Sequence, residues 1–135
     1  MFFMLISTLF TFAQQKGKAS FYNHKMKGHH TSDGGKYQPD SLTCAHRTLP
    51  FGTLLKVRNP SNNKEVIVRV TDRGPHRKNF LIDLSYSAAR QLDIIREGIA
   101  SVEIIKLDSL PNWKFTFPQD STVALNGNSK VFTFK

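Results

Sequence analysis

The pattern of apolar and polar positions predicts a chain of short β-strands with a single helix between residues 17 and 107. Four segments alternate as strands do: Lys18–Tyr22, Thr53–Arg58, Glu65–Val70 and Val102–Leu107. Turn-forming residues at 59–64 join the second strand to the third, which predicts a β-hairpin. An apolar stripe behind a capping serine predicts one helix from Ser85 to Leu92. Together these elements favour a mainly β fold, a compact barrel.

The two ends of the chain differ from this central part. Residues 1–13 are almost entirely apolar, too short to span a bilayer comfortably, and end in Thr-Phe-Ala, which approximates a small-x-small cleavage site. We interpret them as a secretory signal peptide, although no Lys or Arg precedes the apolar run; the alternative is an uncleaved N-terminal anchor. Residues 108–135 form a C-terminal extension, in which the alternation at 114–117 and 131–134 predicts two further strands.

Length and charge narrow the class of protein. The 135 residues suit one small domain, and 19 Lys and Arg against 10 Asp and Glu give a net charge of +9. Such a surface attracts polyanions: nucleic acid, anionic lipid or an acidic cell-wall polymer. The charge is scattered, and neither zinc-finger spacing nor an aromatic-basic RNA-binding motif occurs, so we expect no nucleic-acid partner.

Cys44 is the single cysteine, so an exported domain of this size must depend on its hydrophobic core rather than on an internal disulfide. His46 follows two residues later and would share a strand face with Cys44, which is the arrangement a catalytic thiol and its base would need. We favour the alternative that Cys44 is a small apolar core residue.

Asp72 is the main candidate for catalysis. The strand 65–70 runs directly into Thr71-Asp72-Arg73-Gly74-Pro75, so the carboxylate lies at the end of a stiff element, and the Gly-Pro pair turns the backbone away from it. The alternative is that Asp72 only accepts backbone N–H groups in its own turn. Asp83, just before the helix, is expected to cap it or to brace the barrel.

Three segments together closely resemble the RlpA (rare lipoprotein A) family: 17–22, 42–53, and 71–75 with 82–85. The resemblance covers about residues 17–107 and implies a six-stranded double-psi β-barrel with one short helix, exported to the periplasm or cell envelope. The implied activity is that of an endolytic peptidoglycan transglycosylase. Such a carbon–oxygen lyase cleaves glycan strands, preferably those without stem peptides, to 1,6-anhydromuramic products.

The resemblance also assigns site residues. His46, in Ala-His-x-Thr-Leu-Pro, and Asp72, in Asp-Arg-Gly-Pro, match the polar positions of the implied active cleft. The family's usual Gly-Glu-x-Tyr/Phe-Asp segment reads Gly-Gly-Lys-Tyr-Gln here, which puts Gly35 at the glutamate position and Gln38 at the aspartate position. Two nearby acids, each offset by two residues from those positions, are candidates to substitute: Asp33 and Asp40.

The chemistry of a lytic transglycosylase needs one well-placed carboxyl group, because the 6-hydroxyl of the muramic acid is itself the nucleophile, whereas a hydrolase normally needs two. We therefore expect Asp72 to act as general acid and base, with a pKa raised by partial burial. His46 would orient Asp72 or the substrate; a structural hydrogen-bonding role is the alternative.

Further residues are candidates for binding substrate. Tyr37 and Phe51 could stack on sugar rings, or either could be a core aromatic. Arg73 could hold an acidic glycan group by a bidentate contact, or could stabilise the fold by pairing with a nearby acid. Thr43, Asp33 and Asp40 complete the set of substrate-binding candidates.

We expect neither a cofactor nor a metal, because His24, His29 and His30 lack a recurring ligand spacing. The expected partner of the mature chain is the glycan strand of peptidoglycan, bound by a monomer without a membrane span. A non-catalytic wall-binding barrel in the manner of expansins is the alternative function, and a secreted inhibitor on the same fold is a third.

Overall fold

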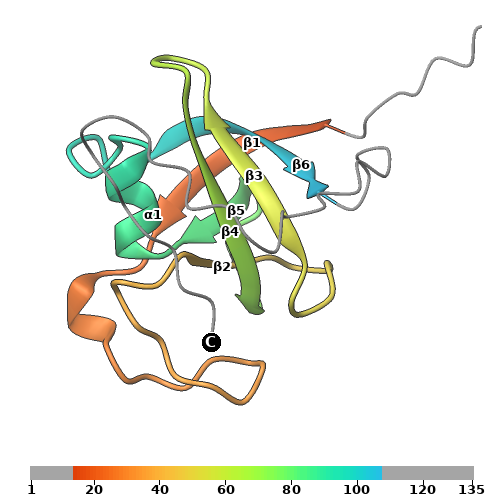
Figure 1. Ribbon diagram of the computed structural model, residues 1–135, viewed down its shortest axis with the longest axis vertical. Coiled ribbons are helices and arrows are strands. Elements are labelled where there is room, and N and C mark those ends of the chain that lie inside the picture. Colours follow the sequence, from red (N-terminus) through yellow and green to blue (C-terminus); the bar gives the residue numbers. More distant parts are fainter. Residues whose placement is uncertain (1–13, 108–135) are drawn as a thin grey trace, which may run out of the picture.

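Residues 14–107 are described by a computed structural model, in which six strands close into a barrel (Figure 1). The strands are β1 (Gln14–Phe21), β2 (Thr43–Ala45), β3 (Leu54–Asn59), β4 (Lys64–Asp72), β5 (Phe80–Leu84) and β6 (Ala100–Lys106). Their order around the barrel is β1-β5-β2-β4-β3-β6. The mainly β, six-stranded barrel expected from the sequence is thus confirmed, whereas the strands expected at 114–117 and 131–134 lie outside the described residues.

The barrel combines hairpin and crossover pairings. Strands β3 and β4 form the predicted antiparallel hairpin, in which Leu55 pairs with Val68 and Val57 with Val66. Two pairs are parallel, β1 with β5 and β2 with β4, and both have a shift in register. Parallel pairs need long connections, and these connections bring loops from distant parts of the sequence to the same end of the barrel.

The alternation of β4 explains how the barrel is filled. Val66, Val68 and Val70 are buried, while Ile67 and Arg69 between them are exposed. Each fully buried aliphatic side chain of this kind contributes about 1.5–3 kcal/mol relative to exposure. The described chain therefore has the hydrophobic core on which a domain without internal disulfides depends.

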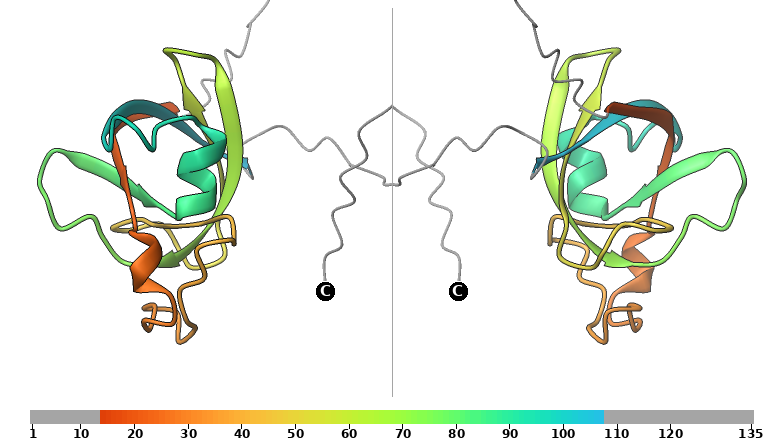
Figure 2. Two further views of the ribbon diagram at one scale, coloured as in Figure 1. Left: turned by 90° about the vertical axis from the view of Figure 1, so that its left-hand side faces the viewer. Right: turned by 90° about the vertical axis from the view of Figure 1, so that its right-hand side faces the viewer.

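The one α-helix within residues 14–107, α1 (Tyr86–Gln91), lies against one side of the barrel (Figure 2). Ser85 caps it by accepting a hydrogen bond from the Ala88 amide at 3.3 Å, as the sequence predicts. Ala88, Ala89 and Leu92 are fully buried in the core, so the predicted apolar stripe is the face that packs. Among residues 14–107, no helix is long and apolar enough to cross a membrane.

The long connection from β1 to β2 positions the candidate site. It begins with a short 3₁₀ turn, η1 (His24–Met26), and lies across the end of the barrel where β4 finishes (Figure 1). Backbone hydrogen bonds dock it there, including the Asp33 amide donating to the Thr71 carbonyl at 3.1 Å. Residues about 40 positions apart in the sequence thereby become neighbours.

Candidate active site

Asp72 is the last residue of β4, and four hydrogen bonds hold its half-buried carboxylate. Oδ1 accepts from the Ser32 amide at 2.9 Å, the Ser32 hydroxyl at 2.6 Å and the Arg73 amide at 2.8 Å. Oδ2 accepts from the Tyr22 hydroxyl at 2.9 Å. Three segments of the chain therefore fix the carboxylate in one orientation.

These donors set the protonation state of the site. Burial by itself raises the pKa of Asp72, but the hydrogen bonds from Ser32, Arg73 and Tyr22 outweigh it and hold the pKa below its usual value. The expectation of a raised pKa is therefore wrong for the free protein, because the sequence did not reveal these donors. The pKa of Tyr22 is raised, mainly by burial and to a smaller extent by its hydrogen bond to Asp72. At neutral pH the pair is an ionised carboxylate and a neutral phenol.

His46 lies beside Asp72 and is 5% exposed. Its backbone amide donates to the Asp72 carbonyl at 3.1 Å. Its Nδ1 accepts from the amides of Thr48 at 3.3 Å and Leu49 at 3.1 Å, so this nitrogen organises the turn after β2. Burial, with the charges of Arg73 and Arg47, lowers the pKa of His46, which favours the neutral ring.

Arg73 points back onto the fold. Its Nη1 donates to the carbonyls of His46 at 3.1 Å and Leu49 at 2.7 Å, and its guanidinium lies 3.9 Å from the centre of the Phe51 ring. Arg73 thus braces the turn through carbonyl groups rather than through an acid. Phe51 is 41% exposed, with one ring face covered by Arg73.

A cleft of about 240 Å³ opens between the β1–β2 connection and the end of β4. It is lined by Thr31, Asp33, Gly35, Lys36, Tyr37, Gln38, Ser41, Thr43, Arg69 and Thr71. A smaller hollow of about 20 Å³ shares Thr31 and Tyr37 with the cleft and reaches Asp72. The cleft and the carboxylate therefore belong to the same end of the barrel.

The structure brings three of the six predicted binding residues to this cleft, whereas Phe51, Arg73 and Asp40 are not among its lining residues. Thr43 and Asp33 line it, while Asp40 is exposed and is not among its lining residues. Tyr37 lines it but is only 4% exposed; its ring lies 5.1 Å from that of Tyr22, and its hydroxyl accepts from the Tyr86 amide at 3.0 Å. Tyr37 thus also has the contacts of a core aromatic.

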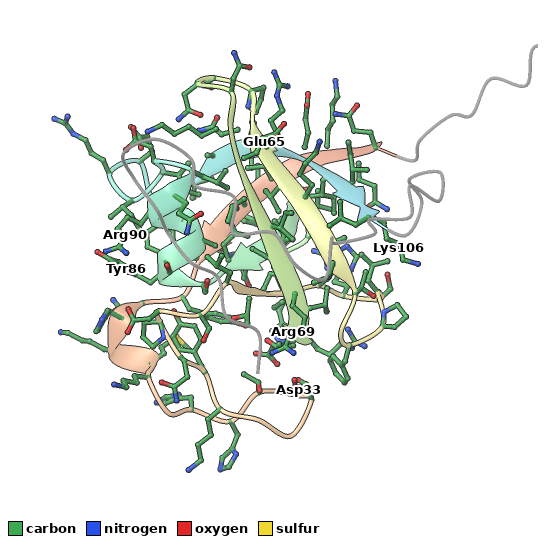
Figure 3. The ribbon with its side chains drawn as sticks, in the orientation of Figure 1. Asp33, Glu65, Arg69, Tyr86, Arg90 and Lys106 are labelled. Atoms are coloured by element: carbon green, nitrogen blue, oxygen red, sulfur yellow. The ribbon has the colours of Figure 1, made fainter. Side chains whose placement is uncertain are left out.

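Asp33, on the docked connection, and Arg69, near the end of β4, both line the cleft (Figure 3). Asp33 Oδ1 accepts from the Thr31 hydroxyl at 2.6 Å and the Gly35 amide at 3.0 Å. These two bonds, with a smaller contribution from the charge of Arg69, lower the pKa of Asp33. The cleft therefore carries an ionised carboxylate of its own at neutral pH.

Sequence reasoning missed two residues that hold the Asp72 carboxylate, Ser32 and Tyr22. Ser32 supplies two donors to Asp72, yet nothing distinguishes it in the sequence from any polar loop residue. Tyr22 follows β1 directly, and β1 is separated from β4 in the barrel by β5 and β2, so no local pattern in the sequence places its hydroxyl at Asp72. Both contacts depend on how the barrel closes.

Two other expectations concern Asp83 and Cys44. Asp83 braces the barrel, since its Oδ1 accepts from the Ser20 hydroxyl across the β1–β5 pair, while Ser85 caps the helix. Cys44 is 1% exposed within the core, and burial raises the pKa of its thiol to about 12, so its interpretation as a core residue is confirmed. In residues 14–107 no group of three His, Cys, Asp or Glu side chains is placed to hold a metal.

Comparison with known proteins adds the family context. A family model described as lytic transglycolase matches residues 14–104. Endolytic peptidoglycan transglycosylase RlpA from Campylobacter jejuni is 50% identical over 88 residues, which are 65% of this chain and 32% of the relative. The protein of the same name from Vibrio cholerae is 46% identical over 96 residues, 70% of this chain and 36% of the relative. The chain thus spans about a third of the length of these curated relatives.

Solved structures show the same fold at greater distance. The Streptomyces papain inhibitor superposes with a TM-score of 0.57 at 22% identity, covering 69% of this chain and 93% of the inhibitor. An expansin from Clavibacter michiganensis also gives 0.57 at 22% identity, covering 70% of this chain and 50% of the expansin. At such identities the likeness concerns the barrel alone.

Proposed function

Because the chain belongs to the lytic transglycolase family, with RlpA proteins among its relatives, we propose that it is an exported endolytic peptidoglycan transglycosylase. Its substrate is the glycan strand, preferably without stem peptides, and its product ends in 1,6-anhydromuramic acid. The observation that carries the proposal is the Asp72 carboxylate, held by four hydrogen bonds at the edge of the cleft.

The reaction begins with uptake of a proton by Asp72. A sugar over the carboxylate removes water and competes for the Ser32 donors, and both effects raise the pKa of Asp72 from its low value in the free protein. The protonated carboxyl then donates to the glycosidic oxygen. The bond from the muramic C1 to this oxygen breaks, and the bonding pair stays with the leaving sugar.

The second half of the reaction returns the proton. The Asp72 carboxylate accepts the proton of the muramic 6-hydroxyl while the oxygen of that hydroxyl forms a bond to C1. The anhydro ring closes, and Asp72 is again protonated, as it was at the start of the first half. One carboxyl group therefore serves both halves, and no water enters the products.

The remaining residues have supporting roles in this proposal. His46 positions Asp72 through the backbone bond between them, and Arg73 holds the His46 turn in place. Thr43 and Tyr37 line the path of the glycan, and the exposed part of Phe51, which stacks on Arg73, offers an apolar surface. Residues 1–13 act as the signal peptide, and the exported domain works as a monomer in the envelope.

The direct test is a product assay. The purified chain is incubated with denuded glycan strands, and anhydromuramic ends are measured by mass spectrometry. We expect product from the wild type and a fall of about 100-fold or more in Asp72→Asn, the loss typical of a missing general acid. Asp93→Asn, which changes an exposed acid after α1, is the matched control and should retain activity. Equal product from Asp72→Asn and wild type would refute the proposal.

A second candidate function is wall binding without cleavage. Gly35 and Gln38 supply no carboxylate to the cleft, and the pKa of Asp72 is lowered in the free protein, which are the features that favour it. This function predicts sedimentation with peptidoglycan sacculi that weakens as salt is raised, because the chain carries a net charge of +9, and no anhydromuramic product. Binding that is insensitive both to salt and to substitution of cleft residues would contradict it.

A further inference from the structure

The cleft contains a second acid that the single-carboxyl reaction leaves unused. Asp33 is the one carboxylate among the cleft-lining residues of the described chain, whereas Asp72 faces the adjoining hollow. The loop that carries Asp33 is fixed on β4 at two successive residues, Ser32 to Asp72 and Asp33 to Thr71. Both acids are thus held by the same docked loop.

We propose that Asp33 is a catalytic residue, the fixed negative charge that stabilises the positive charge developing on the sugar as the glycosidic bond breaks. This inference rests on the proposed function. Cleavage passes through an oxocarbenium-like state, and a preorganised opposite charge next to it lowers the barrier. Asp33 forms no bond to the sugar and transfers no proton, so the proton balance at Asp72 is unchanged.

The hydrogen bonds of Asp33 suit this role. The Thr31 hydroxyl and the Gly35 amide both donate to Oδ1, and they stabilise the ionised form. The same bonds also close a turn, so a purely structural role must be separated from an electrostatic one. Asparagine makes the separation, because its side-chain oxygen can accept both bonds while its charge is zero.

Gly35 provides a second way to test the charge. Its φ is not positive, so other residues can adopt its backbone conformation. A Cβ there would lie 3.2 Å from Asp33 Oδ1 and 3.4 Å from Thr31 Oγ1, so the side chain at position 33 must shift by a few tenths of an ångström to admit it. A side chain at position 35 therefore starts within reach of the place that the Asp33 carboxylate occupies. Gly35→Glu in a chain that lacks the Asp33 charge should return a carboxylate to this wall of the cleft.

The experiment compares four proteins on denuded glycan strands: wild type, Asp33→Asn, Asp33→Asn with Gly35→Glu, and Asp93→Asn as an exposed acid outside the cleft. We expect Asp33→Asn to lower kcat about tenfold or more, which corresponds to about 1.4 kcal/mol in the barrier, with KM and melting temperature little changed. The double variant should recover most of this loss, and Asp93→Asn should match wild type.

The possible outcomes distinguish a failure of the role proposed for Asp33 from a failure of the proposed transglycosylase activity. If wild type forms product, Asp72→Asn does not, and Asp33→Asn equals wild type, only the role of Asp33 is overturned. A loss in Asp33→Asn that comes with a lower melting temperature, and that Gly35→Glu does not restore, also overturns it in favour of a structural turn. If the wild type itself forms no anhydromuramic product, the proposed function fails and this inference fails with it.

Discussion

Tyr22→Phe is predicted to make the reaction faster near neutral pH. The substitution removes the hydroxyl that donates to Asp72 Oδ2 at 2.9 Å, and it keeps the ring that contacts Tyr37. A hydrogen bond to a charged group stabilises that charge by about 1.5–3 kcal/mol. For the Tyr22 bond to the Asp72 carboxylate we use a smaller value of about 1 kcal/mol, because three other donors remain and the site is partly open to water. At 1.36 kcal/mol per tenfold change, the protonated fraction of Asp72 rises about fivefold.

If Asp72 must be protonated to act as the acid, kcat/KM at neutral pH should rise by the same factor of about five. The assay is the initial rate of anhydromuramic product across the acidic to neutral range, where the Tyr22→Phe profile should extend to higher pH than that of wild type. Tyr86→Phe, on α1, is the matched control and should leave the profile unchanged. A loss of activity that is equal at every pH would instead place the Tyr22 hydroxyl on the substrate, and would refute this reasoning.

Three further predictions concern stability. Because the pKa of His46 is lowered in the folded protein, the stabilisation that its neutral ring provides is complete above the usual histidine pKa near 6.5 and is lost as the pH falls through the folded-state pKa. His46→Asn keeps an acceptor near the place of Nδ1 but cannot be protonated in this range. It should therefore flatten the acidic part of a plot of melting temperature against pH. Arg73→Lys loses the stack on Phe51 and a carbonyl bond, and should cost about 1–2 kcal/mol in chemical denaturation; an unchanged midpoint would contradict the bracing role. Gly17→Ala would place a Cβ 2.7 Å from the Cβ of Leu81, so its thermal unfolding should show a loss of about 1–3 kcal/mol.

The sequence predicted those elements whose pattern is local. The hairpin of β3 and β4, the helix with Ser85 as its cap, and β6 all have periodicity long enough to recognise. β2 is three residues long, too short for alternation to be visible, and it became a strand only because β4 and β5 flank it. The barrel as a whole was expected from the resemblance to a family, since no local pattern gives the order of its strands.

The candidate site likewise contains residues that the sequence predicted and contacts that it did not. Asp72 was predicted from its place at a strand end, and the structure does put it there. The direction of its pKa shift was not predictable, because Ser32 and Tyr22 reach it over 40 and 50 residues of sequence. Arg73 was expected to pair with an acid if structural, but it binds carbonyl groups, which carry no signature in a sequence.

The long sequence separation between Asp72 and its donors has a consequence for the timing of activity. The donors at residues 22 and 32 arrive only when the barrel is closed and the β1–β2 connection is seated on it. Because closing a long loop costs entropy before the contact forms, we expect these contacts to form after the local hairpin and helix. For the exported enzyme proposed above, this order of events predicts that Asp72 gains its donors, and with them its organised geometry, only when the barrel has closed.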